Sequence, residues 1–153
     1  MSVEIKPRLR RLATTAAGLA ALAVPLAAAT PAQASTQNVY ATYREHDPFG
    51  NVIFSVTFNG TVTDSGPTGY VLDGDFFADC NPGLIFNEKA AVGHGPASGG
   101  YTWITVDCNK PVDQHIHATG TRGAGDDVDV KVGGTGGLVN VWQYGDRERI
   151  DIG

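Results

Sequence analysis

Apolar and polar residues alternate with a period of two along most of the chain beyond residue 34. In the segment 52–63, one face carries apolar residues and the other carries serine, threonine and asparagine. The apolar positions are Val52, Phe54, Val56, Phe58 and Val62. This alternation is typical of a β-strand with one buried face and one solvated face.

The same pattern, interrupted by turn residues, predicts strands at 39–44, 52–63, 70–78, 84–92, 101–107, 115–119, 128–132, 138–144 and 147–152. The run Asp47-Pro48-Phe49-Gly50 predicts a type I turn that closes a hairpin, and Gly145-Asp146 predicts a type II′ hairpin between the last two strands. No segment has a helical period. We therefore expect an all-β fold, a single small antiparallel β-sandwich or Greek-key barrel of about nine short strands.

The first 34 residues have a different pattern, because an apolar run at 12–29 follows a basic stretch and precedes Ala32-Gln33-Ala34. This order is typical of a cleaved secretory signal peptide, with residues 35–153 left as the single mature domain. The alternative is a membrane anchor, since the run is just long enough to span a bilayer. Pro25 and the small-residue cleavage site favour cleavage. We expect a secreted, extracellular product without a membrane anchor.

Removing this leader changes the charge of the chain. The whole sequence has 11 basic and 16 acidic residues, and the leader holds four of the former and one of the latter, so the remainder has a net charge of −8. Nucleic acid and anionic membrane surfaces are therefore disfavoured as partners, because binding phosphate requires the opposite sign.

Cys80 and Cys108 are the only cysteines in the chain. In an exported protein such a pair is most simply a disulfide. Strand parity puts both residues on the apolar side of their strands, as a bridge between two facing layers requires. Closing a loop of about 28 residues contributes roughly 3–4 kcal/mol in the chain-entropy treatment.

His115 and His117 are two residues apart on a predicted strand, so both imidazoles project from the same face with Cα atoms about 6.5–7 Å apart. Such a pair can bind zinc or copper if a third ligand is near, and the candidates are Asp113, His46 and His94. The alternative is that both side chains simply face solvent, since Ile116 takes the buried side.

Acidic residues give two weaker candidates. Asp126, Asp127 and Asp129 follow a glycine-rich joint that could hold calcium, although their spacing matches no calcium loop. Asp73 and Asp75 share one face of a strand as possible paired carboxylates. Solvated strand faces are the better explanation of both groups.

Aromatic residues form two further pairs. Tyr101 and Trp103 lie on the face opposite Ile104, and Trp142 and Tyr144 share a face near the chain's end. Such pairs either stack against sugar rings or form a protein hot spot, but burial in a core is the more common fate of tryptophan in a small β domain.

The segment 93–100 is rich in glycine and poor in apolar residues, so it is predicted as an exposed loop. It would add His94 and Ser98 to a binding patch around Tyr101 and Trp103. Ser98 does not lie in a G-x-S-x-G nucleophile motif, so catalysis is not favoured.

These features predict a non-catalytic binding or inhibitory domain that acts on an extracellular protein or a cell-surface polymer. A metal-binding secreted protein or enzyme that uses His115 and His117 is the first alternative. A purely structural extracellular component is the second.

Overall fold

The computed structural model describes residues 34–80, 89–135 and 141–152, which contain β-strands and no helix. Within these ranges no helix is long and apolar enough to cross a membrane. The strands are β1 (Thr36–His46), β2 (Val52–Asp64), β3 (Gly69–Asp79), β4 (Lys89–Pro96), β5 (Thr102–Asp107), β6 (Val112–Thr121), β7 (Val128–Gly134), β8 (Gln143–Tyr144) and β9 (Glu148–Ile150).

The first sheet has the strand order β1-β2-β3-β6, and every pair is antiparallel. The predicted hairpin between β1 and β2 is confirmed. Its turn is closed by the Gly50 amide, which donates to the Asp47 carbonyl oxygen at 3.0 Å, and Gly50 has a positive φ of 88°. Glycine adopts this conformation without the steric cost that a side chain would add.

The second sheet has the order β5-β4-β7, and β8 and β9 both pair with β7. The predicted hairpin at Gly145-Asp146 is therefore wrong, because β8 and β9 follow one another along the same edge of β7. The Gly145 amide donates to the Val132 carbonyl oxygen at 2.9 Å, and a Cβ at this position would lie 2.3 Å from the carbonyl oxygen of Thr42. Gly145 thus makes a close approach to β1 at the break between the two strands.

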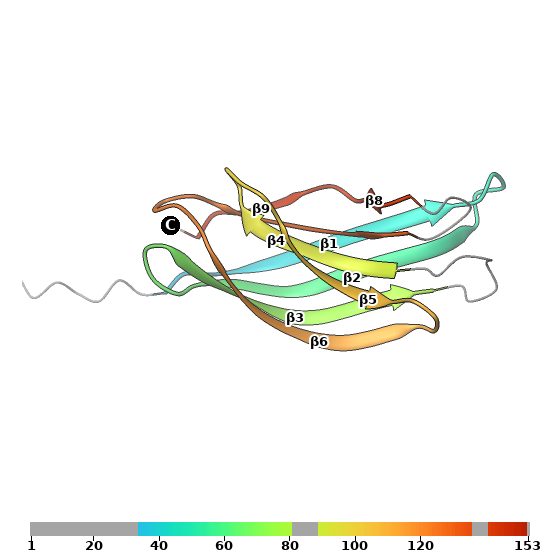
Figure 1. The fold of residues 1–153 in the computed structure, drawn as a ribbon, viewed down its shortest axis with the longest axis horizontal. Coiled ribbons are helices and arrows are strands. Elements are labelled where there is room, and N and C mark those ends of the chain that lie inside the picture. The colour runs from blue at the N-terminus through green and yellow to red at the C-terminus, as the bar shows by residue number, and fades with distance from the viewer. Residues whose placement is uncertain (1–33, 81–88, 136–140, 153) are drawn as a thin grey trace, which may run out of the picture. The chain divides into compact units, whose positions relative to one another are not determined.

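The two sheets enclose one apolar core, so the predicted two-sheet, all-β fold is confirmed. Figure 1 shows β1, β2, β3 and β6 side by side, with β4 and β5 lying across them in a second layer. The core includes Val39, Ala41, Phe54, Val56, Phe58, Val62, Tyr70, Leu72, Phe76, Ala78, Val92, Ile116, Val128, Val130 and Val132. These residues occupy the apolar face that the alternating pattern predicts.

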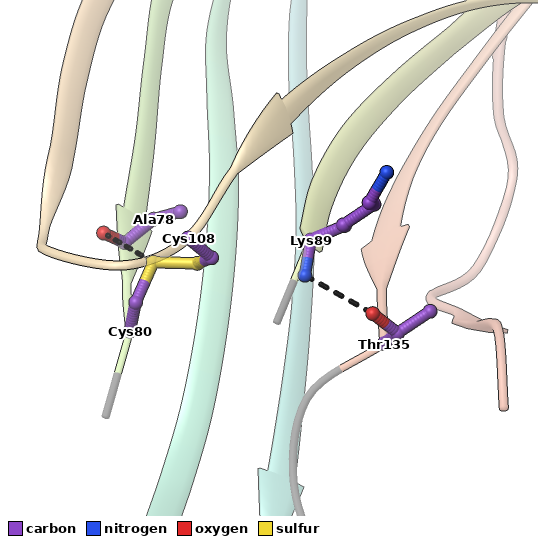
Figure 2. Close-up of a disulfide and its surroundings, with 5 residues drawn as sticks. All are labelled: Ala78, Cys80, Lys89, Cys108 and Thr135. Carbon is purple, nitrogen blue, oxygen red and sulfur yellow. Dashed lines mark hydrogen bonds between the residues drawn. A yellow bond between two sulfur atoms is a disulfide. The ribbon is translucent and has the colours of Figure 1, made fainter. Parts of the chain in front are cut away.

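The predicted disulfide is confirmed between Cys80, just after β3, and Cys108, just after β5. The bridge therefore joins the two sheets, and both cysteines are buried. Figure 2 shows the bridge together with the contact of the Cys80 sulfur to the Ala78 carbonyl oxygen at 3.6 Å. The same view shows the Lys89 amide donating to Oγ1 of Thr135 at 3.0 Å, which ties the start of β4 to the end of β7.

The structure of segment 93–100 differs from the exposed loop that the sequence predicts. Residues 93–96 belong to β4 and are not an exposed loop, and the connection to β5 is limited to residues 97–101. Val92 and His94 point into the core, whereas Gly93 and Gly95 take the outward positions. The sequence of this segment predicts a loop because its outward positions are glycines, which leave no alternation of apolar and polar side chains.

Some predictions lie outside the described residues. They are the signal peptide, up to residue 33, the first half of the strand predicted at 84–92, and the start of the strand predicted at 138–144.

Candidate functional site

The outer face of the second sheet carries four neighbouring aromatic rings, which we call the aromatic row: Tyr101, Trp103, Tyr144 and Trp142. Successive ring centroids along this row are 5.5, 4.7 and 6.1 Å apart. The planes are inclined to one another by 31°, 33° and 10°. These separations fall in the range in which aromatic rings attract one another in offset arrangements.

Glycine in the central strands makes room for these rings. Trp103 is paired with Gly93 of β4, and a Cβ at Gly93 would lie 2.6 Å from the indole ring. Tyr144 is paired with Gly133 of β7, where a Cβ would lie 2.6 Å from the phenol ring. The rings carried by the two edges of the sheet therefore lie over the backbone of β4 and β7 and meet above the centre of the sheet.

Lys131 of β7 places its amine among the rings of this row. The Nζ atom lies 4.2 Å from the Tyr101 centroid, 4.7 Å from the Tyr144 centroid and 5.2 Å from the Trp103 centroid. All three distances fit a cation–π interaction. The register pairs Lys131 with Gly93, so no side chain from β4 separates the amine from the indole of Trp103.

A charged cluster of Asp129, Arg147 and Arg149 adjoins the row. Asp129 is only 1% exposed, and its two carboxylate oxygens accept hydrogen bonds from Arg147 Nη1 and Arg149 Nε, each at 3.1 Å. Burial of Tyr101, followed by the negative charge of Asp129, raises the pKa of the phenol, and Arg147 acts in the opposite direction. Tyr101 is therefore the point where the aromatic row meets the charged cluster.

The predicted patch is brought together only in part. Tyr101 and Trp103 are neighbours, and Trp103 is half-buried on the outer face and is not part of the core. His94 is 1% exposed between the sheets, so it does not belong to this surface. Ser98 donates through Oγ to the Asp126 carboxylate in the connection between β6 and β7.

Sequence reasoning missed the cations of this site and treated its aromatic pairs separately. The outward-facing glycines at 93 and 133 were the available signal, because they lie opposite Trp103 and Tyr144 on neighbouring strands. Without the register, nothing in the sequence connects Lys131 with Trp103 or Tyr144.

A second polar group lies on the outer face of the first sheet, where β3 and β6 pair. Nδ1 of His115 lies 3.0 Å from Asp75 Oδ1, and Nδ1 of His117 lies 2.7 Å from Asp73 Oδ2. Nε2 of His115 is also 3.4 Å from Asp73 Oδ1. The hydrogen bond to Asp75 raises the pKa of His115, and the hydrogen bond from His117 lowers the pKa of Asp73. We call these four residues the His–Asp array.

The metal predictions find no support in this arrangement. Over the described ranges, no group of three or more histidine, cysteine, aspartate or glutamate residues is placed to hold a metal ion. Of the candidate third ligands for zinc or copper, Asp113 is paired with Phe77, and His94 is buried between the sheets. The residues expected to bind calcium have separate roles, since Asp129 binds two arginines and Asp126 binds Ser98.

Comparisons with known proteins give no family. No protein-family model matches the chain, and no curated protein or solved structure matches it. The function must therefore be inferred from the geometry of the site.

Proposed function

We propose that residues 35–153 form an exported, non-catalytic binding module that engages an extracellular protein or a cell-surface polymer through the aromatic row. The observation that carries this proposal is the gathering of four aromatic rings on the outer face of one sheet, with Trp142 37% exposed and Tyr144 40% exposed. Aromatic side chains supply much of the binding energy at protein surfaces, because they offer large contact areas at little cost in conformational entropy.

The scaffold suits a binding role. The rings are carried by residues in or beside β5 and β8, and both sides of the row lie over the central strands β4 and β7 of the second sheet. A disulfide ties the same sheet to the other layer. A surface fixed in this way loses little freedom on binding, which favours affinity. An inhibitor would be the same kind of module with an enzyme as its partner.

Export is part of the proposal. It rests on the leader-like pattern of residues 1–34, and the disulfide is compatible with an oxidising compartment.

The experiment is affinity capture with residues 35–153 immobilised, using the culture medium and cell-wall fraction of the producing cells. We expect a retained partner whose binding falls at least tenfold when Trp142→Ala is introduced, as is typical of an interface hot spot. Trp142 is chosen because it is exposed, so the fold should survive its loss. Circular dichroism and a thermal melt verify that the variant is folded.

The matched control is Tyr40→Ala. Tyr40 is 56% exposed on the first sheet, away from the aromatic row, so its removal should leave binding unchanged. A partner retained equally by the wild type and by Trp142→Ala would show that the row is not the binding surface.

A further inference from the structure

The aromatic row lies next to a concentration of positive charge in an otherwise acidic domain. Residues 35–153 have a net charge of −8 and seven basic residues, and three of those seven, Lys131, Arg147 and Arg149, surround Tyr101 and its neighbours. Elsewhere, Lys89 pairs with Asp107, and Arg122 is buried against Asp64. Three of the seven basic residues of the domain are thus gathered beside the aromatic row, and two of them share the buried carboxylate of Asp129.

These cations remain accessible to a ligand. The side chains of Arg147 and Arg149 are 53% and 51% exposed, and each is bonded to Asp129 through one nitrogen. A guanidinium has five N–H donors, so further donors are left on both arginines. Besides Asp129, the negative charges of Asp127 and Asp126 also raise the pKa of Arg149. Arg147 also has a side-chain hydrogen bond with Tyr101, and its remaining N–H donors lie beside the same rings as the amine of Lys131.

The surface combines aromatic rings with cations above a layer of small residues. The outward positions of β4 and β7 beneath the rings include Gly93, Gly133 and the buried Ala91, which is paired with Gly133. A row of rings beside basic groups suits a chain of sugar rings, whose apolar faces contact aromatics and whose carboxylates accept charge-assisted hydrogen bonds.

We propose that the aromatic row, together with Lys131 and Arg147, binds an acidic polysaccharide that carries carboxylate groups. This inference rests on the proposed function and narrows its partner from proteins and polymers in general to one class of polymer. The rings contact the sugar faces, and the amine of Lys131, held among three rings, meets a carboxylate of the ligand.

Native affinity electrophoresis and calorimetry with residues 35–153 test this proposal. The probes are polygalacturonate and hyaluronan, both linear and rich in carboxylates, and methyl-esterified polygalacturonate, which keeps the sugar backbone without the charge. We expect binding to at least one acidic polymer, at least tenfold weaker binding to the esterified form where polygalacturonate binds, and weakening by added salt.

Charge-matched variants locate the site. Lys131→Met and Arg147→Gln should each reduce affinity about tenfold or more, as should Trp142→Ala. Lys110→Gln removes the same charge from an exposed position in the turn between β5 and β6, so it should leave affinity unchanged. Equal losses in Lys110→Gln and Lys131→Met would reveal an effect of net charge alone and would overturn the proposal.

The remaining outcomes separate this inference from the broader one. Failure of both acidic polymers to bind, while Trp142→Ala still abolishes capture of a protein or a neutral polymer, overturns the acidic ligand and leaves the binding module standing. Equal binding of esterified and free polygalacturonate would likewise overturn the acidic ligand and leave the binding module standing. If Trp142→Ala affects no captured partner of any kind, both proposals fail.

Discussion

The hydroxyl of Tyr70 lies 2.9 Å from Nδ1 of His94, and both side chains are buried in the core. Tyr70 belongs to β3 of the first sheet and His94 to β4 of the second, so this polar contact joins the two layers. Burial lowers the pKa of His94 and raises the pKa of Tyr70 to about 12. Both groups are therefore neutral near pH 7, and the Tyr70 hydroxyl can donate to the imidazole nitrogen.

Tyr70→Phe should lower the free energy of unfolding by about 1–3 kcal/mol, because it leaves a buried imidazole nitrogen without its partner. Urea denaturation at pH 7.5 measures the change. Tyr40→Phe removes a hydroxyl from a residue that is 56% exposed and should leave stability unchanged. Equal stabilities for Tyr70→Phe and the wild type would mean that the hydrogen bond between Tyr70 and His94 contributes nothing to the free energy of unfolding.

The ionisation of His94 gives a second prediction. Its pKa in the folded state lies below the ordinary value of about 6.5, so the unfolded chain binds more protons just below that pH. The stability that the neutral ring contributes is therefore complete above about pH 6.5 and is lost as the pH falls. NMR titration should give a His94 midpoint below about 6.5. A midpoint at or above that value would contradict the effect of burial.

Most of the fold follows from the alternation of apolar and polar residues, because a strand buried on one face leaves a period of two in the sequence. Phe54, Leu72 and Val130 are all buried as this pattern predicts. The pattern fails in β4, where His94 is buried and both outward neighbours are glycine. A strand whose outward positions are glycine has a composition similar to that of a loop, so the sequence does not distinguish the two.

The candidate site is less predictable, because it depends on register and strand order. Trp103 and Tyr144 are 41 positions apart in the sequence and meet only because β4 and β7 are adjacent. The shared face of His115 and His117, in contrast, follows from their spacing of two on a strand, and both rings are exposed. Its carboxylate partners, Asp73 and Asp75, could not be paired with it before the register of β3 against β6 was known.

Gly93→Ala should disturb the aromatic row. The new Cβ would lie 2.6 Å from the indole of Trp103, so the ring must move, with a cost of about 1–3 kcal/mol in stability. We expect a shift in tryptophan fluorescence and weaker binding of any ligand of the row. Gly100→Ala is the matched control, since a Cβ there would meet nothing within 4 Å. Unchanged fluorescence in Gly93→Ala would contradict the close packing of Trp103 on β4.

Replacing both cysteines by alanine should lower the free energy of unfolding by about 3–4 kcal/mol, because the bridge closes a loop with a sequence separation of 28 residues. Urea denaturation of the wild type and of the double variant, with and without a reducing agent, measures this change. The reducing agent should destabilise the wild type and leave the double variant unaffected. Equal denaturation midpoints for the two proteins would show that the link between the sheets is not a stabilising one.

The His–Asp array gives the last prediction, which concerns Asp75→Asn. The hydrogen bond to Asp75 is the main cause of the raised pKa of His115, so its loss should lower that pKa towards the ordinary value of about 6.5. NMR titration of the His115 ring measures the shift. Asp113→Asn makes the same change of charge on β6, opposite Phe77, and should leave the titration of His115 nearly unchanged.

The direction of the accompanying change in stability follows from the two shifted groups. A raised pKa of His115 gives stability that is complete below about pH 6.5 and is lost as the pH rises through the folded value. The lowered pKa of Asp73 gives stability that is present above its ordinary value, near pH 4, and is lost in stronger acid. The array therefore stabilises the sheet most between about pH 4 and 6.5, where His115 is protonated and Asp73 is ionised. Asp75→Asn should narrow the difference in melting temperature between pH 5.5 and pH 8, and an unchanged difference would show that the array does not couple stability to pH.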